Sequence, residues 1–385
     1  MEQTKIWRNR KVLFLCAFLF LISSLLSGCM TEKNVETHSG SKLNLPFEKK
    51  EIPHLFTGSE IIAPLQMGQG QFNTITGWLN NETILYLMNV DFGSNLYTYN
   101  VHTGITKLVY ESEAPIASVI VNPFGSKILI HAAPTTYEGL ITIIDINGKE
   151  LMKERLEAFD FVFKWSPYNE DLLLISLFTE NWDFSMVKVN IAESQMTNVP
   201  LKEPFVYWLN EDDLLYLDWS NENATLLAPL MKKSLTNMNE GKMLNQVYHV
   251  ESIKNFLMTI TVKPEQKKEA VYSFLRNDFQ ELSSFTIPHL TRFSDWLIPF
   301  FDFDEENHFL TFKPLYSAAA DEYQEGFQLI SFDFIKGEMK VLFEDLKNEP
   351  LSCAPNGELC LYGFYYEKLL DMKTKQVIPL INIEK

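Results

Sequence analysis

Two of the four cysteines lie close together near the C-terminal end, in the stretch LSCAPNGELC from Leu351 to Cys360. Six residues separate Cys353 from Cys360, and a Pro-Asn-Gly turn lies between them. Cysteines at this spacing can form a disulfide, or supply two thiolates to a metal or redox site. A metal site needs more ligands than this segment supplies. The choice between a disulfide and two thiols depends on the strands that carry the residues.

A third cysteine, Cys29, follows a segment with the three-part layout of a secretory signal. An uncharged apolar run, Val12–Leu26, is preceded by four basic residues, which are Lys5, Arg8, Arg10 and Lys11. The run is shorter than the roughly 20 residues that a membrane-spanning helix needs. The sequence LSGC from Leu26 to Cys29 resembles the bacterial lipobox, in which small residues allow a dedicated peptidase to cut before the cysteine.

This motif predicts cleavage between Gly28 and Cys29, so that residues 1–28 are a lipoprotein signal peptide. Cys29 then becomes an S-diacylglycerol cysteine with an N-acyl group such as palmitate. Two or three acyl chains give stable anchoring, whereas one gives marginal binding. We therefore expect a protein held in the cell membrane by the lipid on Cys29 and facing outside the cytoplasm. The alternative is an ordinary signal anchor with an incidental cysteine.

The charge of the chain is strongly negative. The formal net charge is -17, and removal of residues 1–28 takes away four basic residues and one acidic residue, leaving -20. This charge argues against a nucleic-acid partner, because phosphates demand clusters of Lys and Arg. It also repels anionic headgroups, so the lipid must supply the anchoring. Residues 29–55 are mostly polar and lack periodicity, which predicts a flexible tether before a folded domain at 56–385.

No catalytic or metal-binding motif stands out. The seven histidines form no His-Glu-x-x-His motif and no close pair with metal spacing; they are His38, His54, His102, His131, His249, His289 and His308. No Gly-x-Ser-x-Gly elbow is present. The acidic stretch DFDEEN, Asp302 to Asn307, could offer oxygens to Ca²⁺, but it lacks the EF-hand order and also fits a turn. We predict no cofactor, no metal and no enzymatic activity.

A repeat of short apolar strands and polar turns runs through the rest of the chain. Each copy begins with an apolar anchor, followed by a turn and a strand, as in WLNNETILYL from Trp78. The first four anchors, Trp78, Val121, Trp165 and Trp208, are 43, 44 and 43 residues apart. Looser copies begin at Val250, Phe303 and Cys353, with gaps of 42, 53 and 50 residues. In the first three copies, a second strand ends in Asp or Asn, at Asn100, Asp145 and Asn190. These three residues are 45 residues apart.

A period of this length, built from four strands, is typical of β-propeller blades. One blade cannot cover both of its faces, whereas stacked blades cover each other. The seven anchors predict an all-β fold, a propeller of seven four-stranded antiparallel blades. Six blades would result if the Val250 copy were an insertion or if the terminal strands paired to close one blade. Two β-sandwich domains are the alternative, which the regular spacing disfavours.

The turns within the repeat have a structural explanation. In NPFG, SPYN and APNG, the fixed φ of proline suits the second position of a type I turn. The Gly or Asn two residues later tolerates positive φ and predicts a bulged hairpin. These pairs are Pro123 and Gly125, Pro167 and Asn169, and Pro355 and Gly357.

The turns and strands resemble the SPDG-type repeats of TolB-like propellers. Together with the lipobox, most of the mature chain resembles the YqgU-like propeller lipoproteins of low-GC Gram-positive bacteria. The resemblance implies the fold and the location, and it transfers no catalytic residues to this sequence.

The repeat changes the interpretation of LSCAPNGELC. Cys353 occupies an anchor position, and Cys360 occupies the apolar position of Leu85, Ile128, Leu172 and Leu215. Free cysteine behaves as a small buried hydrophobe. The bulged turn predicts that Cys353 faces Leu359 and that Cys360 faces Ser352, so that the sulfurs point to opposite faces. We therefore favour two buried thiols, with a disulfide as the alternative.

Aromatic residues outside the anchors could line a binding surface, although packing between blades is the alternative for each. They are Trp182, Trp219, Trp296, Phe300, Phe301, Tyr365 and Tyr366. The sequence favours a monomeric, non-enzymatic binding or scaffold module for a protein or cell-wall ligand. The rival is an extracytoplasmic lyase or hydrolase, in which His and carboxylates from several blades meet at the channel mouth.

Overall fold

The computed structural model describes residues 64–65, 67, 69–219, 225–262 and 268–381. The chain divides into two units, Met1–Phe56 and Thr57–Lys385, and every described residue belongs to the second. The signal peptide, Gly28 and Cys29, the tether at 29–55, and two of the histidines, His38 and His54, lie outside the described residues. Within the described residues, no helix is long and apolar enough to cross a membrane.

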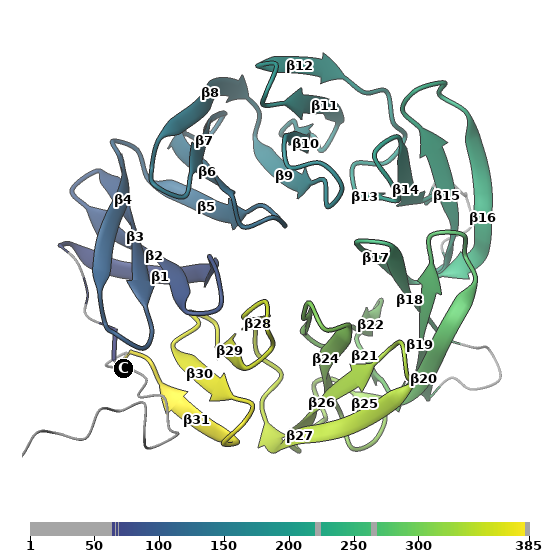
Figure 1. The fold of residues 1–385 in the computed structure, drawn as a ribbon. Helices are drawn as coiled ribbons and strands as arrows, with labels where there is room; N and C mark the ends of the chain where they lie inside the picture. The colour runs from purple at the N-terminus through teal and green to yellow at the C-terminus, as the bar shows by residue number, and fades with distance from the viewer. Residues whose placement is uncertain (1–63, 66, 68, 220–224, 263–267, 382–385) are drawn as a thin grey trace, which may run out of the picture. The chain divides into compact units, whose positions relative to one another are not determined.

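The described strands form seven four-stranded antiparallel sheets, which follow one another along the chain and around a ring (Figure 1). We call them blades 1 to 7 in chain order. Blade 1 contains β1 (Gln71–Trp78), β2 (Thr83–Val90), β3 (Gly93–Asn100) and β4 (Thr106–Ser112), and blade 2 contains β5 (Ile116–Val121), β6 (Lys127–Thr135), β7 (Glu138–Asp145) and β8 (Glu150–Glu157). Blade 3 contains β9 (Asp160–Trp165), β10 (Leu172–Phe178), β11 (Phe184–Asn190) and β12 (Gln195–Asn198), and blade 4 contains β13 (Val206–Trp208), β14 (Asp213–Leu217), β15 (Ala228–Ser234) and β16 (Glu240–Val247).

Blades 5 to 7 complete the ring. Blade 5 contains β17 (His249–Ile253), β18 (Phe256–Val262), β19 (Glu269–Arg276) and β20 (Glu281–Pro288), blade 6 contains β23 (Phe301–Phe303), β24 (His308–Lys313), β26 (Phe327–Asp333) and β27 (Glu338–Leu346), and blade 7 contains β28 (Leu351–Cys353), β29 (Leu359–Tyr362), β30 (Lys368–Asp371) and β31 (Gln376–Pro379). A small additional sheet is formed by β21 (Leu290–Thr291), β22 (Trp296–Leu297) and β25 (Ala318–Ala319). The predicted all-β propeller of four-stranded antiparallel blades is confirmed, and its described four-stranded sheets number seven.

The first strand of a blade lies toward the centre of the ring and the fourth lies outermost, as blades 2, 3, 5 and 7 show clearly (Figure 1). Side chains of a strand alternate between its two faces, and each face packs against a different neighbouring blade. In β2, Ile84 and Tyr86 join the apolar cluster between blades 1 and 7, whereas Leu85 and Leu87 join the cluster between blades 1 and 2. The core is therefore a series of inter-blade layers, which explains why one repeat alone cannot be stable.

The apolar anchors close the first strand of each blade, with one exception. Strand β17 ends at Ile253, which pairs with Phe256. The anchor of blade 5 is therefore Ile253, and the predicted anchor, Val250, was wrong by three residues. With this correction the last gaps become 45, 50 and 50 residues, closer to the regular first part of the repeat.

The predicted bulged turns form in two of three places. Gly125 has φ 64° and Gly357 has φ 69°, and their N–H groups donate to Asn122 and Ala354 over 2.9 and 2.8 Å. The prediction for Pro167 and Asn169 was wrong, because Asn169 does not adopt a positive φ. Its carbonyl instead accepts a hydrogen bond from the N–H of Leu172, over 3.2 Å, in a longer turn.

The register predicted for blade 7 was also wrong. Cys353 lies directly opposite Cys360, with a Cα–Cα distance of 3.8 Å, and a disulfide joins them. The bulge lies inside the turn, because the N–H of Ala354 donates to the carbonyl of Leu359 over 2.8 Å. Both sulfurs therefore lie on one face. The apolar character of the positions is confirmed, since Cys353 is 8% and Cys360 0% exposed within the cluster between blades 6 and 7.

Candidate functional site

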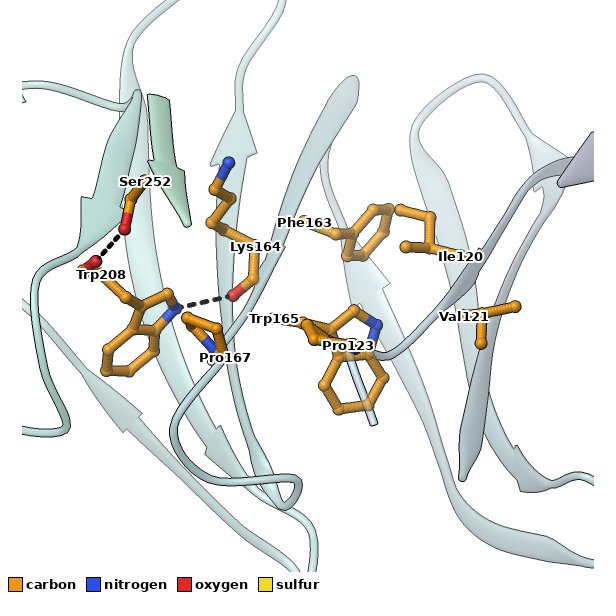
Figure 2. A pocket seen from close by; sticks show the side chains of 9 residues that line it. All are labelled: Ile120, Val121, Pro123, Phe163, Lys164, Trp165, Pro167, Trp208 and Ser252. Atoms are coloured by element: carbon orange, nitrogen blue, oxygen red, sulfur yellow. Dashed lines mark hydrogen bonds between the residues drawn. The ribbon is translucent and has the colours of Figure 1, made fainter. Parts of the chain in front are cut away.

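A cavity of about 290 Å³ lies along the inner strands β5, β9, β13 and β17 (Figure 2). It is lined mainly by aromatic, aliphatic and proline side chains, with one lysine and one serine. The lining residues are Ile120, Val121, Pro123, Phe163, Lys164, Trp165, Pro167, Trp208 and Ser252. Most of them lie where the inner strands end and the following turns begin. The anchors of the repeat thus form the walls of this cavity.

Two of the anchor tryptophans make the same contact with the preceding blade. Trp208 Nε1 donates to the carbonyl of Lys164 over 3.1 Å, and Trp78 Nε1 donates to the carbonyl of Ser352 over 2.8 Å. Each acceptor comes directly before the anchor of the neighbouring blade. The indole N–H groups therefore fasten adjacent inner strands together at blades 3 and 4 and at blades 7 and 1.

Trp165 holds the same position in blade 3 but does not make this contact. By position its acceptor would be the carbonyl of Ile120, which also lines the cavity. Trp165 is only 5% exposed, yet its Nε1 has no hydrogen-bond partner among the described residues. Figure 2 shows the bond from Trp208 to Lys164 and the unbonded indole of Trp165. A buried N–H without an acceptor is costly, and Trp165 therefore carries an unmet donor in the wall of the cavity.

A charged pair lies beside the cavity and spans blade 4. Lys164 Nζ lies 2.7 Å from Glu251 Oε1 and 4.8 Å from the centre of the Tyr207 ring. Burial and the neighbouring Glu251 charge raise the pKa of Tyr207, so its phenol stays protonated. Burial lowers the pKa of His249, although Glu251 opposes this effect, so the imidazole is neutral near pH 7. The positive charge of Lys164 is therefore balanced by the carboxylate of Glu251, with which it forms an ion pair.

The lining groups are suited to binding. The Ser252 hydroxyl donates to the carbonyl of Trp208, so its proton is already engaged. Nucleophilic catalysis by serine needs a base within hydrogen-bond reach of that hydroxyl, whereas the hydroxyl of Ser252 contacts a backbone carbonyl. The cavity instead offers aromatic rings, two prolines, one indole N–H and one paired ammonium. Such a wall fits an apolar group that carries a hydrogen-bond acceptor.

The structure brings two of the sequence-predicted polar residues together, since His308 Nδ1 lies 2.8 Å from Asp304 Oδ2. Within the described ranges, no group of three or more His, Cys, Asp or Glu could hold a metal ion. His131, His249 and His289 each have one ring nitrogen without a hydrogen-bond partner among the described residues. The stretch Asp302 to Asn307 leads into a turn as expected, because Asp304 Oδ1 accepts from the N–H groups of Glu306 and His308, each over 2.9 Å.

The aromatic candidates divide into two groups. Trp182, Trp219, Phe300 and Tyr365 are exposed. Trp296, Phe301 and Tyr366 are half-buried and pack against the inter-blade clusters, as the alternative interpretation held.

The sequence did not single out Trp165 as a binding residue. An anchor needs only apolar volume, which Val121 supplies in blade 2. Because a tryptophan at position 165 adds an N–H that packing does not require, this donor was the signal that could have pointed to a binding residue. Whether that N–H finds an acceptor depends on the spacing of two blades, which no local pattern reports.

Comparisons with known proteins agree with the fold. The family described as YqgU-like 6-bladed beta propeller domain matches residues 100–363. That range begins at the end of β3 and ends just after β29, so it contains five whole blades and parts of blades 1 and 7. The family description counts six blades, whereas the described residues of this chain form seven four-stranded sheets.

Individual relatives extend the match over most of the chain. The uncharacterized lipoprotein YqgU of Bacillus subtilis (strain 168) is 25% identical over 310 residues, which are 80% of this chain and 84% of that protein. The crystal structure of lmo1340 from Listeria monocytogenes EGD-e has a TM-score of 0.77 at 20% identity, covering 84% of this chain and 98% of that one. The β-propeller domain of the Trilobed protease from Pyrococcus furiosus has a TM-score of 0.52 at 10% identity, covering 81% of this chain and 98% of that one. These structures support the fold alone.

Proposed function

Because the chain belongs to the YqgU-like 6-bladed β-propeller family, we propose that it is a lipid-anchored, extracytoplasmic binding module whose ligand occupies the cavity beside Trp165. A similar protein is a lipoprotein, and this sequence carries a lipobox of its own that ends at Cys29. Neither observation assigns a ligand. The site is proposed from the geometry of the cavity, and the module acts as a monomer without a nucleic-acid partner.

The unpartnered indole of Trp165 carries the proposal. The indole N–H groups of Trp78 and Trp208 donate to carbonyls of the preceding blade. A tryptophan at the anchor position can therefore find a hydrogen-bond acceptor within the protein. Trp165 Nε1 has no such partner among the described residues, and both Trp165 and Ile120 line the cavity. A ligand that brings a carbonyl or carboxylate oxygen to this N–H gains a hydrogen bond at a site that is already formed.

The size of the cavity limits what it can hold. About 290 Å³ lies at the lower end of the roughly 300–1,000 Å³ typical of ligand sites. We infer that it takes one apolar group and one acceptor of a larger molecule, such as an acetamido group of a cell-wall glycan or a peptide unit of a protein. The aromatic and proline walls suit the methyl or side-chain part of that group.

An extracytoplasmic lyase or hydrolase is the alternative. It would draw on His, Asp and Glu from several blades at one mouth of the ring, and no metal-binding group of three such residues occurs in the described part of the chain. The lining of the cavity, with one engaged serine and one paired lysine, favours binding.

The binding site is tested by ¹⁹F NMR of protein labelled with 5-fluorotryptophan. The Trp165 signal is assigned by its disappearance in Trp165→Phe. The labelled protein is then titrated with three probes: an N-acetylglucosamine disaccharide, a muramyl peptide and an N-acetylated dipeptide amide. We expect at least one probe to shift the Trp165 signal saturably and to leave that of Trp78 unchanged. If no probe moves the Trp165 signal, the proposed site is rejected.

The anchoring is tested separately with Cys29→Ala. The acyl acceptor is removed, so the variant should remain uncleaved or leave the membrane fraction, and metabolically supplied labelled palmitate should no longer be incorporated. A variant that is processed, labelled and retained like the wild type would show that Cys29 is not the lipid site.

A further inference from the structure

Exposed aromatic side chains gather at one end of the ring. In each blade, the turns after the first and third strands lie at one end, which we call the turn face. The loops after the second and fourth strands lie at the other end, which we call the loop face. Among the described residues, twelve Phe, Trp and Tyr side chains are exposed, and all except Phe124 lie on the loop face. The cavity beside Trp165 lies at the turn face, so these aromatics belong to another surface.

The loop face has a groove of about 590 Å³ where blades 2 and 3 meet. Its walls include Tyr137, Phe159 and Phe178, from the loops β6–β7 and β8–β9 and from the end of β10. The ring centre of Trp182 lies 5.9 Å from that of Phe178 and 6.5 Å from that of Phe159, whose ring is 6.1 Å from Tyr137. Four aromatic rings thus form a continuous row, of which three are exposed and Phe178 is buried beneath them.

Trp182 is held in an unusual conformation. Its φ is 65°, in the left-handed region where Gly and Asn are favoured and bulky residues are rare. Two hydrogen bonds hold the turn: the N–H of Trp182 donates to the carbonyl of Thr179 over 3.0 Å, and the N–H of Thr179 donates to that of Asp183 over 2.8 Å. The indole is nevertheless 65% exposed. An exposed tryptophan at a strained backbone position indicates that its side chain serves binding rather than the stability of the fold.

The groove is acidic. Glu138, Glu157, Glu180 and Asp183 line it, and its lining contains no Lys, Arg or His. Glu138 is paired with Arg155. Glu157, Glu180 and Asp183 form no ion pair with any other described residue. Aromatic faces attract cations, and carboxylates at the rim add to that attraction.

We propose that this groove docks an extended segment of another protein that is rich in Lys and Arg. The rings provide apolar area for the stems of these side chains and π-faces for their charged ends, and the carboxylates steer their approach. A membrane surface fits less well, because anionic headgroups would be repelled by the same carboxylates.

The docking is tested with the full-length protein in detergent micelles. The probe is a short fluorescein-labelled peptide of alternating arginine and serine, followed by fluorescence anisotropy at low salt. A peptide of equal length with glutamate in place of arginine is the control. We expect saturable binding of the arginine peptide only, weakened at least about tenfold by Trp182→Gly and also weakened by the triple variant E157Q/E180Q/D183N.

The variant Trp182→Gly separates docking from folding, since glycine adopts positive φ freely and the turn should remain stable. Phe293→Ser removes a fully exposed aromatic of the same face outside the groove and should bind like the wild type. Equal binding by Trp182→Gly and the wild type would mean attraction by net charge alone, and it would overturn the proposal. Absence of binding would overturn it too.

A second measurement tests the membrane as the occupant. The wild type and Trp182→Gly are reconstituted in nanodiscs with and without brominated phosphatidylcholine, and tryptophan fluorescence is recorded. For a protein-docking groove we expect the same fractional quenching in both proteins. Stronger quenching of the wild type would place Trp182 in the bilayer and overturn the proposal.

Discussion

Removal of the disulfide between Cys353 and Cys360 should weaken the last blade by a calculable amount. The bond closes a short loop, with a sequence separation of seven residues, inside the hairpin of β28 and β29. Its main effect is to restrict the unfolded chain. We consider the double variant Cys353→Ala/Cys360→Ala, which removes the bond and leaves neither sulfur unpaired.

The chain-entropy relation gives about 8 cal/mol/K for a loop of this size, or about 2.4 kcal/mol of unfolding free energy at 25 °C. A unit of the size of Thr57–Lys385 unfolds with an entropy of roughly 0.7 kcal/mol/K near its melting temperature. The loss therefore corresponds to a fall of about 3 to 4 °C in Tm.

Differential scanning calorimetry of the wild type and the double variant, each with and without dithiothreitol, checks this value. The reductant should lower the Tm of the wild type toward that of the variant and should leave the variant unchanged. Alkylation of the denatured, unreduced protein followed by peptide mass spectrometry should find both residues unmodified. If both are alkylated without reduction, the cysteines are thiols and the reasoning from blade 7 fails.

Three further predictions concern other inter-blade contacts. Trp208→Phe removes the hydrogen bond to the carbonyl of Lys164, whereas Trp165→Phe removes an N–H that has no described acceptor. Chemical denaturation should therefore give Trp208→Phe a free energy of unfolding about 1 kcal/mol lower than that of Trp165→Phe. Equal losses in the two variants would contradict the contact. Burial raises the pKa of Asp302 from 3.8 to about 6, so the folded state binds this proton more tightly than the unfolded state, and the free energy of unfolding should fall by up to about 3 kcal/mol as the pH rises from below about 4 to well above about 6. Denaturation curves of the wild type and of Asp302→Ala across this range test it, and an equal pH dependence would refute it. Glu251→Gln leaves the Lys164 ammonium without its partner across blade 4, which should lower the free energy of unfolding by about 1 kcal/mol at low salt. A double-mutant cycle with Lys164→Met measures the interaction energy of the pair. A value near zero would show that the pair does not contribute to stability.

The anchors and turns were sufficient to predict the architecture. Spacings of 43 and 44 residues between Trp78, Val121, Trp165 and Trp208 reflect the constant length of a four-stranded unit, which local hydrophobic pattern reports directly. The pattern failed in blade 5, where a two-residue turn between Ile253 and Phe256 replaces the longer turns of the other blades. A changed turn length moves the anchor without changing the apolar run, so Val250 looked equivalent.

Register was harder to predict than strand position. The sequence APNG fixed the turn type at Gly357, but the bulge could lie inside or outside the cysteine pair, and the two placements send the sulfurs to one face or to two. The candidate sites were harder still. The unpartnered indole N–H of Trp165 and the groove beside Trp182 depend on distances between blades and loops that are far apart in sequence, and these distances are tertiary properties.

Among the described strands, the first and last blades close the ring without exchange of a strand, and this has a mechanical consequence. The closure rests on the packing of blades 1 and 7 and on hydrogen bonds such as that from Trp78 to Ser352. The first described residues lie at the same joint: the N–H of Leu65 donates to the carbonyl of Leu380 over 2.9 Å, and the carbonyl of Pro64 accepts from the Tyr99 hydroxyl over 2.7 Å. A pulling force transmitted along the preceding chain would therefore load this joint first, so blades 1 and 7 are where the ring would yield under tension.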